Sequence, residues 1–231
     1  MQTDRRAFIL GGASLAIGSA GAWAWTRPAQ AALRCTPFDA RGIQFCEVGL
    51  DQNLGAVTAQ QQNSQWCWAA CISAIFSYHG YPVEQGRIVA ATYGQLVNLP
   101  AHGRQIAAAT NRPWQDVRGR AFASQCQVLW DSGAYVARPD AAGQAAQELA
   151  QGHPLIIGAA GHAMVLTAMS YARNAAGGGQ PTQAIVRDPW PGRGRRALEQ
   201  REWMQIQFLA KVQVSGVAGP GPGGGKGPGG K

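Results

Sequence analysis

Residues 60–71 read Gln-Gln-Gln-Asn-Ser-Gln-Trp-Cys-Trp-Ala-Ala-Cys, and they join a run of amides to an apolar segment that extends to His79. The apolar positions after Cys67 recur at the i, i+3, i+4, i+7 spacing of one buried helical face. They are Trp68, Cys71, Ile72, Ile75 and Phe76. This pattern predicts a helix from Cys67 to about His79, and either Asn63 or Ser64 is expected to cap its N-terminus.

The position of Cys67 at the start of this helix matters for its chemistry. A cysteine is a strong nucleophile only as the thiolate, and the unpaired N–H groups and positive dipole of a helix N-terminus lower a thiol pKa. The alternative is that Cys67 is a small buried hydrophobic residue, as many cysteines are. A catalytic role is therefore favoured only if the rest of the chain supplies partners for the thiol.

The N-terminal segment, residues 1–31, has the composition of an export signal. Arg5-Arg6-Ala7-Phe8-Ile9 precedes a small-residue apolar run from Gly11 to Trp25, and Ala29-Gln30-Ala31 has the form of a cleavage site. This arrangement resembles a bacterial twin-arginine signal and implies a periplasmic or secreted protein. A membrane anchor is the alternative, although four glycines interrupt the apolar run. We expect no stable membrane insertion after the signal is removed.

Two further segments flank the region that is predicted to form the main domain, residues 59–215. Residues 32–58 mix apolar and polar positions and are expected to form an extended lead-in, and whether it is removed on activation is left open. Residues 216–231 contain nine glycines and three prolines. Such a composition cannot bury enough apolar surface to offset chain entropy, so we expect a disordered tail.

The net charge of +8 could favour acidic partners, but its distribution argues against nucleic acid. The arginines are scattered, with one cluster at Arg193-Gly194-Arg195-Arg196. Aromatic residues do not interleave with them as a stacking platform for bases would require. We therefore expect no nucleic-acid partner.

Five cysteines follow the predicted signal, and an odd number in an exported protein indicates disulfide pairs plus one free thiol. If Cys67 is the free thiol, we expect Cys35 to pair with Cys46, because these two close a short loop. We further expect Cys71 to pair with Cys126, although a reduced and buried Cys71 is an equal alternative.

The predicted elements are helical in the first half of the chain and sheet-forming in the second. Helices are expected at 67–79, 82–93, 103–109 and 141–151, the last capped by Asp140. Strands are expected at 125–130, 155–157, 162–171 and 183–187, and within 195–203 and 208–214. Strands 162–171 and 183–187 are expected to pair in antiparallel fashion. This order predicts an α+β fold with room for a cleft between the two halves.

A nucleophilic cysteine needs a base for its proton, and the chain has four histidines. His162 follows a glycine and begins a predicted strand, which leaves its imidazole at one end of a sheet. His79 lies in the last turn of the Cys67 helix, where it is expected to interact with the helix dipole. His102 and His153 lie in predicted surface loops beside prolines. His162 is therefore the candidate base, and a structural histidine is the alternative.

Two further residues complete a candidate catalytic set. Asp188 ends the strand that should pair with the strand of His162, and its carboxylate can accept the second imidazole N–H. Gln61 lies six residues before Cys67, where its amide can reach the substrate carbonyl that the thiolate attacks. Each residue alone has a simpler interpretation: Asp-Pro is a common start of a turn, and Gln61 is one of several solvated amides in a polar run.

Together these residues resemble the papain-like cysteine peptidases, and most closely their compact bacterial branch, with the plant-pathogen effector proteases and the double-glycine leader peptidases as relatives. The motifs are Gln61, Trp66-Cys67-Trp68-Ala69-Ala70, Gly161-His162 and Asp188-Pro189-Trp190. The resemblance covers residues 59–192 and implies a helical lobe that carries Cys67, packed on an antiparallel sheet lobe that carries His162.

The resemblance also implies a role for each residue of the set. Cys67 would be the nucleophile, His162 the proton shuttle, Asp188 the group that orients His162, and Gln61 the oxyanion-hole donor. The implied substrate is a peptide or protein, and neither a metal nor an organic cofactor is required. The preferred cleavage residues and the oligomeric state are left open.

The chain departs from its relatives in two respects. No cysteine matches the disulfide that larger papain relatives place just before the nucleophile, and no transporter domain accompanies the motifs, which disfavours a leader peptidase coupled to export. The same triad would serve a cell-wall amidase or an acyl transferase, and a catalytically inactive binding protein on this fold is a further alternative. A metal or redox module is disfavoured by the Cys-x-x-x-Cys spacing.

Overall fold

The computed structural model describes residues 33–50, 60–133, 141–176 and 179–216. The predicted export signal, the predicted cap at Asp140 and residues 217–231 of the predicted tail lie outside these ranges.

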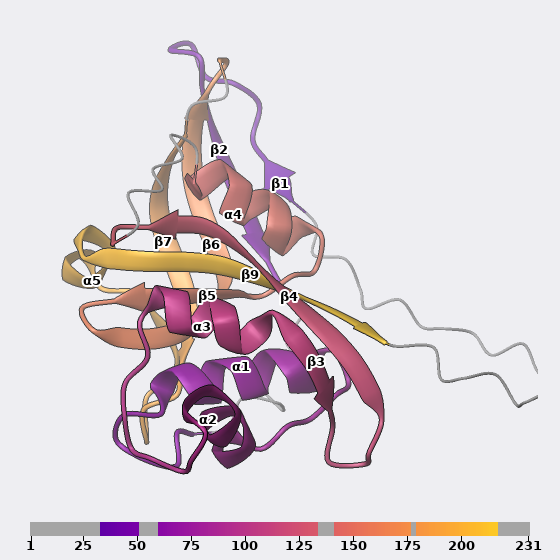
Figure 1. Cartoon of the computed structure of the whole chain (residues 1–231). Coiled ribbons are helices and arrows are strands. Elements are labelled where there is room, and N and C mark those ends of the chain that lie inside the picture. The colour runs from indigo at the N-terminus through magenta and orange to yellow at the C-terminus, as the bar shows by residue number, and fades with distance from the viewer. Residues whose placement is uncertain (1–32, 51–59, 134–140, 177–178, 217–231) are drawn as a thin grey trace, which may run out of the picture.

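Within the described residues, nine strands form one antiparallel sheet (Figure 1). Its main path runs in the order β1-β2-β6-β5-β9-β4-β3, and β7 pairs with β6 and with β8. The strands are β1 Arg34–Cys35, β2 Ile43–Gly49, β3 Arg112–Gln115, β4 Ala121–Asp131, β5 Leu155–Ala159, β6 His162–Asn174, β7 Gly179–Asp188, β8 Gly194–Ala197 and β9 Ile206–Gly216. The predicted pairing of the strand of His162 with the strand before Asp188 is confirmed, because β6 and β7 are antiparallel neighbours.

Helices cover the two faces of this sheet, as Figure 1 shows. One group packs on one face and comprises α1 Cys67–Tyr78, α2 Gln85–Tyr93 and α3 Gly103–Thr110, while α4 Ala141–Ala150 covers the other. Alternate side chains of a strand point to opposite faces. Accordingly Ile156 packs in the core under α1 to α3, and its neighbours Leu155 and Ile157 pack in the core under α4. The α+β fold is thus confirmed, with two cores that share one sheet.

The predicted lead-in forms part of the sheet where the structure describes it. Strand β2 pairs with β6 from Ile43 opposite Asn174 to Gly49 opposite Ala168, and a disulfide joins Cys35 to Cys46. The predicted pairing of these two cysteines is therefore confirmed. The domain boundary between residues 58 and 59 stays a prediction.

The predicted Cys71–Cys126 disulfide is wrong, because both residues are free thiols. Cys71 is buried in the core under α1 to α3, whereas the Cys126 thiol on β4 interacts with Thr110 of α3. The alternative, a reduced and buried Cys71, is correct. Cys67 is also a free thiol, as expected.

Helix α2 begins at Gln85 rather than at Pro82. The carbonyl of Pro82 accepts the Val117 N–H at 2.9 Å, and the carbonyl of Val83 accepts the Ser73 hydroxyl at 2.6 Å. These tertiary hydrogen bonds hold residues 82 and 83 in an extended conformation, so the helix begins three residues later than predicted.

Residues 195–203 were expected to be a strand, but they divide into β8 and the short helix α5 Gln200–Met204. The backbone N–H of Glu199 donates to Glu202 Oε2 at 2.8 Å. This capping interaction starts a helical turn and outweighs the strand pattern.

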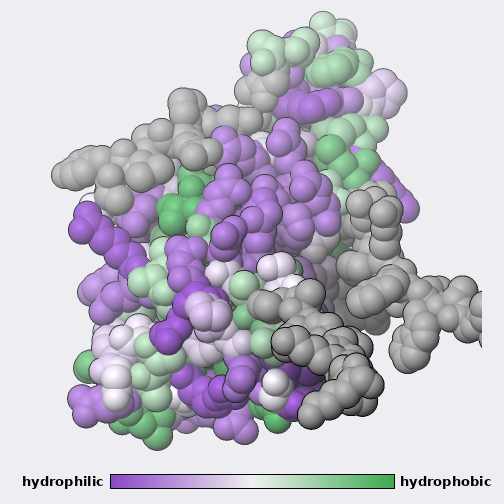
Figure 2. All heavy atoms as spheres, turned by 45° about the vertical axis from the view of Figure 1, so that its right-hand side comes forward, coloured by the Kyte–Doolittle hydropathy of each residue, from purple (hydrophilic) through white to green (hydrophobic). Residues whose placement is uncertain are grey.

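The surface seen in Figure 2 is mainly hydrophilic, and its hydrophobic areas are small and separated. No helix in the described ranges has the length and apolar character needed to cross a bilayer.

Candidate active site

Cys67 is the first residue of α1, as predicted, but the expected cap is wrong. Trp66 occupies the N-cap position, and no side chain donates or accepts a capping hydrogen bond there. Asn63 instead accepts the Trp66 N–H through its backbone carbonyl, at 3.1 Å. The Trp68 N–H, one of the groups that a helix N-terminus leaves unpaired, interacts with the Cys67 sulfur and lowers the pKa of the thiol.

His162 is placed by a tight turn between β5 and β6. Ala160 and Gly161 have φ values of 51° and 77°, and the flanking residues Ala159 and His162 face each other across the ladder. Two consecutive positive φ values are typical of the type I′ hairpin turn, which glycine adopts at little cost. The turn therefore makes His162 the first residue of β6, at the sheet end beside α1.

The thiol of Cys67 and the imidazole of His162 interact directly, and each changes the pKa of the other. Burial raises the pKa of Cys67, but hydrogen bonding with His162 and with the Ala163 and Trp68 N–H groups outweighs burial and lowers it overall. Burial lowers the pKa of His162, whereas Asp188 and Cys67 raise it, and the net pKa is about 9. Each group therefore favours the charged form of the other, as in a thiolate–imidazolium pair.

Asp188 lies at the end of β7, and its carboxylate is fully buried. Its Oδ1 lies 2.7 Å from His162 Nε2 and accepts the backbone N–H of Trp190 at 2.9 Å. Burial raises the pKa of this carboxyl group, but hydrogen bonds from His162, Trp190 and Arg196 lower it to about 2. The carboxylate is therefore ionised throughout the physiological pH range, and it faces the imidazole edge away from Cys67.

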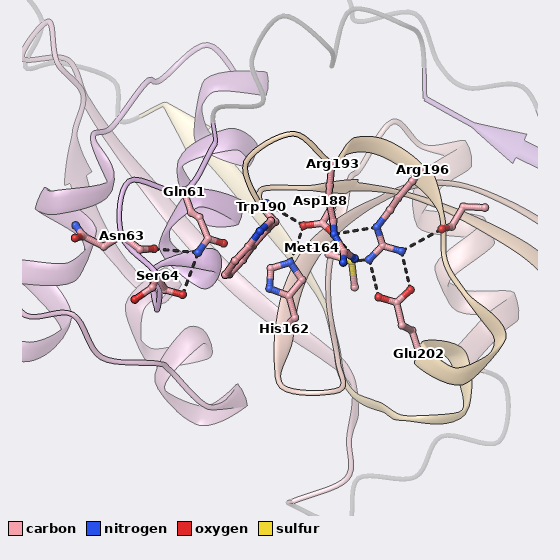
Figure 3. A network of polar contacts seen from close by, with 11 residues as sticks. Gln61, Asn63, Ser64, His162, Met164, Asp188, Trp190, Arg193, Arg196 and Glu202 are labelled. Carbon is pink, nitrogen blue, oxygen red and sulfur yellow. Dashed lines mark hydrogen bonds and ion pairs between the residues drawn. The ribbon is translucent and has the colours of Figure 1, made fainter.

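The Trp190 indole also lies against His162, with 6.2 Å between ring centroids in an edge-to-face arrangement. Figure 3 shows its side chain between Gln61 and Asp188. The ring thus contacts His162 from the turn that follows Asp188.

Gln61 is buried next to this group, and its backbone N–H donates to the Pro189 carbonyl at 2.8 Å. Its Nε2 donates to the carbonyls of Asn63 and Ser64, each at 3.0 Å, as Figure 3 shows. Its Oε1 is buried without a hydrogen-bond partner. The structure therefore brings Gln61 to the turn that follows Asp188, with its amide N–H groups directed at its own loop.

Gln85 holds the loop of Gln61 in place and was not identified from the sequence. Its side chain is 2 % exposed, its Oε1 accepts the Gln62 N–H at 3.0 Å, and its Nε2 donates to the Gln60 carbonyl at 2.9 Å. These hydrogen bonds clamp the backbone on both sides of Gln61. A glutamine at the start of a helix gives no sequence signal for partners so far along the chain.

The other histidines lie apart from this group. His79 caps the C-terminus of α1, where burial and then the neighbouring His153 lower its pKa to about 4. His79 therefore lies at the C-terminus of α1 as predicted, but its imidazole is neutral at pH 7 and brings no charge to the helix dipole. His153 pairs with Glu148 at 2.8 Å, and His102 is exposed before α3. In the part of the chain that the structure describes, no three His, Cys, Asp or Glu side chains gather as a metal site would require.

A cleft of about 600 Å³ opens beside Cys67 and His162. Its walls come from both layers of the fold, namely the helical layer with the start of α3 and the sheet layer with the β5–β6 turn and β9. The lining residues beyond the two reactive side chains include Gln65, Pro100, His102, Asp131, Gly158 and Phe208. The predicted cleft between the two halves is thus present, and the nucleophile stands at its edge.

The three free cysteines should differ sharply in reactivity. Cys67 is half-buried with a lowered pKa, whereas burial raises the pKa of Cys71 and of Cys126. Because the thiolate is the reactive form, we expect iodoacetamide at pH 7 to label Cys67 at least about tenfold faster than either of the others. Peptide mapping of the adducts measures this. Equal labelling of the three cysteines would contradict the thiolate–imidazolium pair.

The chain is similar to two solved structures and matches one family of known proteins. Among solved structures, the chain is similar to the peptidase domain of Streptococcus ComA, a bifunctional ABC transporter, with a TM-score of 0.43 and 14 % identity, covering 69 % of this chain and 97 % of that one. It is also similar to a double-glycine-motif protease of an AMS/PCAT transporter in complex with the leader peptide, with a TM-score of 0.41 and 13 % identity, covering 69 % and 91 % of the two chains.

No curated protein matches the chain. Residues 51–203, more than half of the chain, match the family described as papain-like cysteine protease AvrRpt2. The chain therefore belongs to this family of papain-like cysteine peptidases.

Proposed function

We propose that this protein is an exported cysteine peptidase in which Cys67, His162 and Asp188 form the catalytic triad and Gln61 is the oxyanion donor. One observation carries the proposal. The thiol and the imidazole meet at the edge of a cleft of about 600 Å³, and the imidazole is held from its other side by a buried carboxylate at 2.7 Å. A nucleophile, a base and an orienting group in this order are the parts that acyl transfer requires.

In the proposed reaction, the Cys67 thiolate attacks the carbonyl carbon of a peptide bond that lies in the cleft. The C–N bond then breaks, the leaving amine takes a proton from the His162 imidazolium, and a thioester remains on Cys67. His162 next accepts a proton from water as that water attacks the thioester. The C–S bond then breaks, the carboxylic acid leaves, and the Cys67 thiolate and His162 imidazolium are restored. Asp188 stabilises the imidazolium and fixes the ring in the orientation that both steps need.

The oxyanion that forms on the substrate requires hydrogen-bond donors close to the thiol. The Cys67 backbone N–H is suited to this role because the first N–H groups of a helix have no partner within the helix. Gln61 is the second donor, and the role requires one of its Nε2 hydrogens to turn from a backbone carbonyl toward the oxyanion. The Gln85 clamp supports this assignment because it fixes the backbone of Gln61 beside the site.

Export is supported by two independent features. The Arg5-Arg6-Ala7-Phe8-Ile9 pattern before a small-residue apolar run is typical of twin-arginine signals. The disulfide between Cys35 and Cys46 is of a kind that persists in oxidising compartments such as the periplasm or the extracellular medium.

Replacing Gln61 tests the oxyanion assignment. Loss of one such donor lowers kcat by about 10²–10³ in other acyl-transfer enzymes, with little change in KM because the interaction forms in the transition state. We expect Gln61→Ala to show this loss on fluorescein-labelled casein, and Cys67→Ala to be inactive. Gln62→Ala is the matched control, because its side chain is exposed one residue away. If Gln61→Ala cleaves casein as fast as Gln62→Ala, Gln61 is not the donor.

Export can be tested separately from catalysis. Replacing Arg5 and Arg6 together by lysine keeps the charge and removes the arginine pair that defines the signal class. We expect this variant to accumulate unprocessed in the cytoplasm, as measured by cell fractionation and immunoblotting in a bacterium with a twin-arginine pathway. Arg27→Lys, in the same segment, should be exported normally. Export of the double variant at the wild-type level would rule out a twin-arginine signal.

A further inference from the structure

We infer that Arg196 and Glu202 form a positioning pair that holds the carboxylate of Asp188, and through it the imidazole of His162, in the orientation that Cys67 requires. The inference rests on the triad proposed above and adds two residues to it. Figure 3 shows the pair on the far side of Asp188 from His162.

The Arg196 guanidinium has five N–H donors, and the structure provides five acceptors. Its Nε donates to Asp188 Oδ2 at 2.8 Å. Its Nη1 donates to Glu202 Oε2 at 2.7 Å and to the Ala197 carbonyl at 3.1 Å. Its Nη2 donates to Glu202 Oε1 at 2.6 Å and lies 3.1 Å from Met164 Sδ. Because all five donors have acceptors, the planar guanidinium is held in one orientation. It therefore fixes the position of Asp188 Oδ2, the carboxylate oxygen that His162 does not contact.

The local fold accounts for this contact. Strands β7 and β8 pair so that Val186 faces Arg196 and Asp188 faces Gly194. Arg196 and Asp188 therefore lie on the same face of the ladder as diagonal neighbours. The turn of α5 that follows then brings Glu202 to the outer side of the guanidinium. The short run β7–β8–α5 thus places a carboxylate on each side of one cation.

The charges around Asp188 single out Arg196 as the effective cation. His162 approaches from β6, and Arg193 lies 3.8 Å from Oδ2 with 54 % of its side chain exposed, whereas the exposed fraction of the Arg196 side chain is 17 %. Solvent screens an exposed charge more strongly than a buried one. The remaining titratable groups nearby are Cys67 on the far side of His162 and the buried Cys71, which interacts electrostatically with Asp188.

Replacing either member of the pair should shift the pH at which Cys67 ionises, and the two replacements should shift it in opposite directions. Removing the cation of Arg196 leaves two carboxylates near the site, which disfavours a thiolate and raises the pH at which Cys67 ionises. Removing the anion of Glu202 leaves Arg196 with Asp188 alone, which favours the thiolate and lowers that pH. A role limited to packing would move neither value.

We would measure the pH dependence of Cys67 alkylation by iodoacetamide, and casein cleavage over a range of fluorescein-casein concentrations, in the purified full chain. Arg196→Met should raise the alkylation midpoint by about 0.5–1 pH unit and Glu202→Gln should lower it by a similar amount. Arg196→Lys keeps the charge but not the planar group, so its midpoint should stay near the wild-type value while kcat falls about tenfold at unchanged KM. Arg195→Met is the matched control, since it makes the same charge change at an exposed position on β8.

The outcomes separate this inference from the proposed function. Midpoints for Arg196→Met and Glu202→Gln that coincide with those of Arg195→Met, or that move in the same direction, would overturn the positioning pair. If Arg196→Met does not fold by circular dichroism, Glu202→Gln and Arg196→Lys decide the question. Midpoints that move as expected in a protein that does not cleave casein would support the pair and contradict the peptidase assignment for this substrate.

Discussion

The contact between the Cys67 thiol and the His162 imidazole is the interaction on which the site depends. The two groups come from opposite layers, one from the first residue of α1 and the other from the first residue of β6. Each is partly buried, which by itself would suppress both charges. Hydrogen bonding offsets that effect: the bond with His162 lowers the pKa of Cys67, and Asp188 together with Cys67 raises the pKa of His162 to about 9. The packing of α1 on the sheet therefore has an electrostatic consequence as well as a structural one.

The rest of the site can be understood as support for this pair. The two-residue turn at Ala160 and Gly161 fixes where β6 begins. Asp188 supplies a buried negative charge that favours protonated His162, and the Trp190 ring lies edge-to-face against the imidazole. Burying a carboxylate is costly unless its oxygens are satisfied, and here hydrogen bonds from His162, Trp190 and Arg196 satisfy them. The ionised pair therefore depends on a chain of contacts that extends to the edge of the sheet.

The sequence was informative wherever a local pattern had a single interpretation. The apolar spacing after Cys67 predicted α1, and the Gly-His and Asp-Pro signals located the ends of β6 and β7. It failed where a tertiary contact decided the outcome. The start of α2 depends on hydrogen bonds from distant residues, and Gln85 and Arg196 act on partners that only the fold brings near. The predicted disulfide of Cys71 was wrong for the same reason. The direction of a helical side chain decides which thiols can meet, and the fold sets that direction.

The most direct test is to titrate the His162 imidazole by NMR in the wild-type chain and in Cys67→Ala. The interactions described above give His162 a pKa of about 9 in the wild type, so the imidazolium should persist through neutral pH. Without the thiolate, this pKa should fall by about 1 unit, while Asp188 keeps it above the ordinary value of 6.5. A pKa at or below 6.5 in the wild type, or one that is the same in both proteins, would contradict a thiolate–imidazolium pair supported by Asp188.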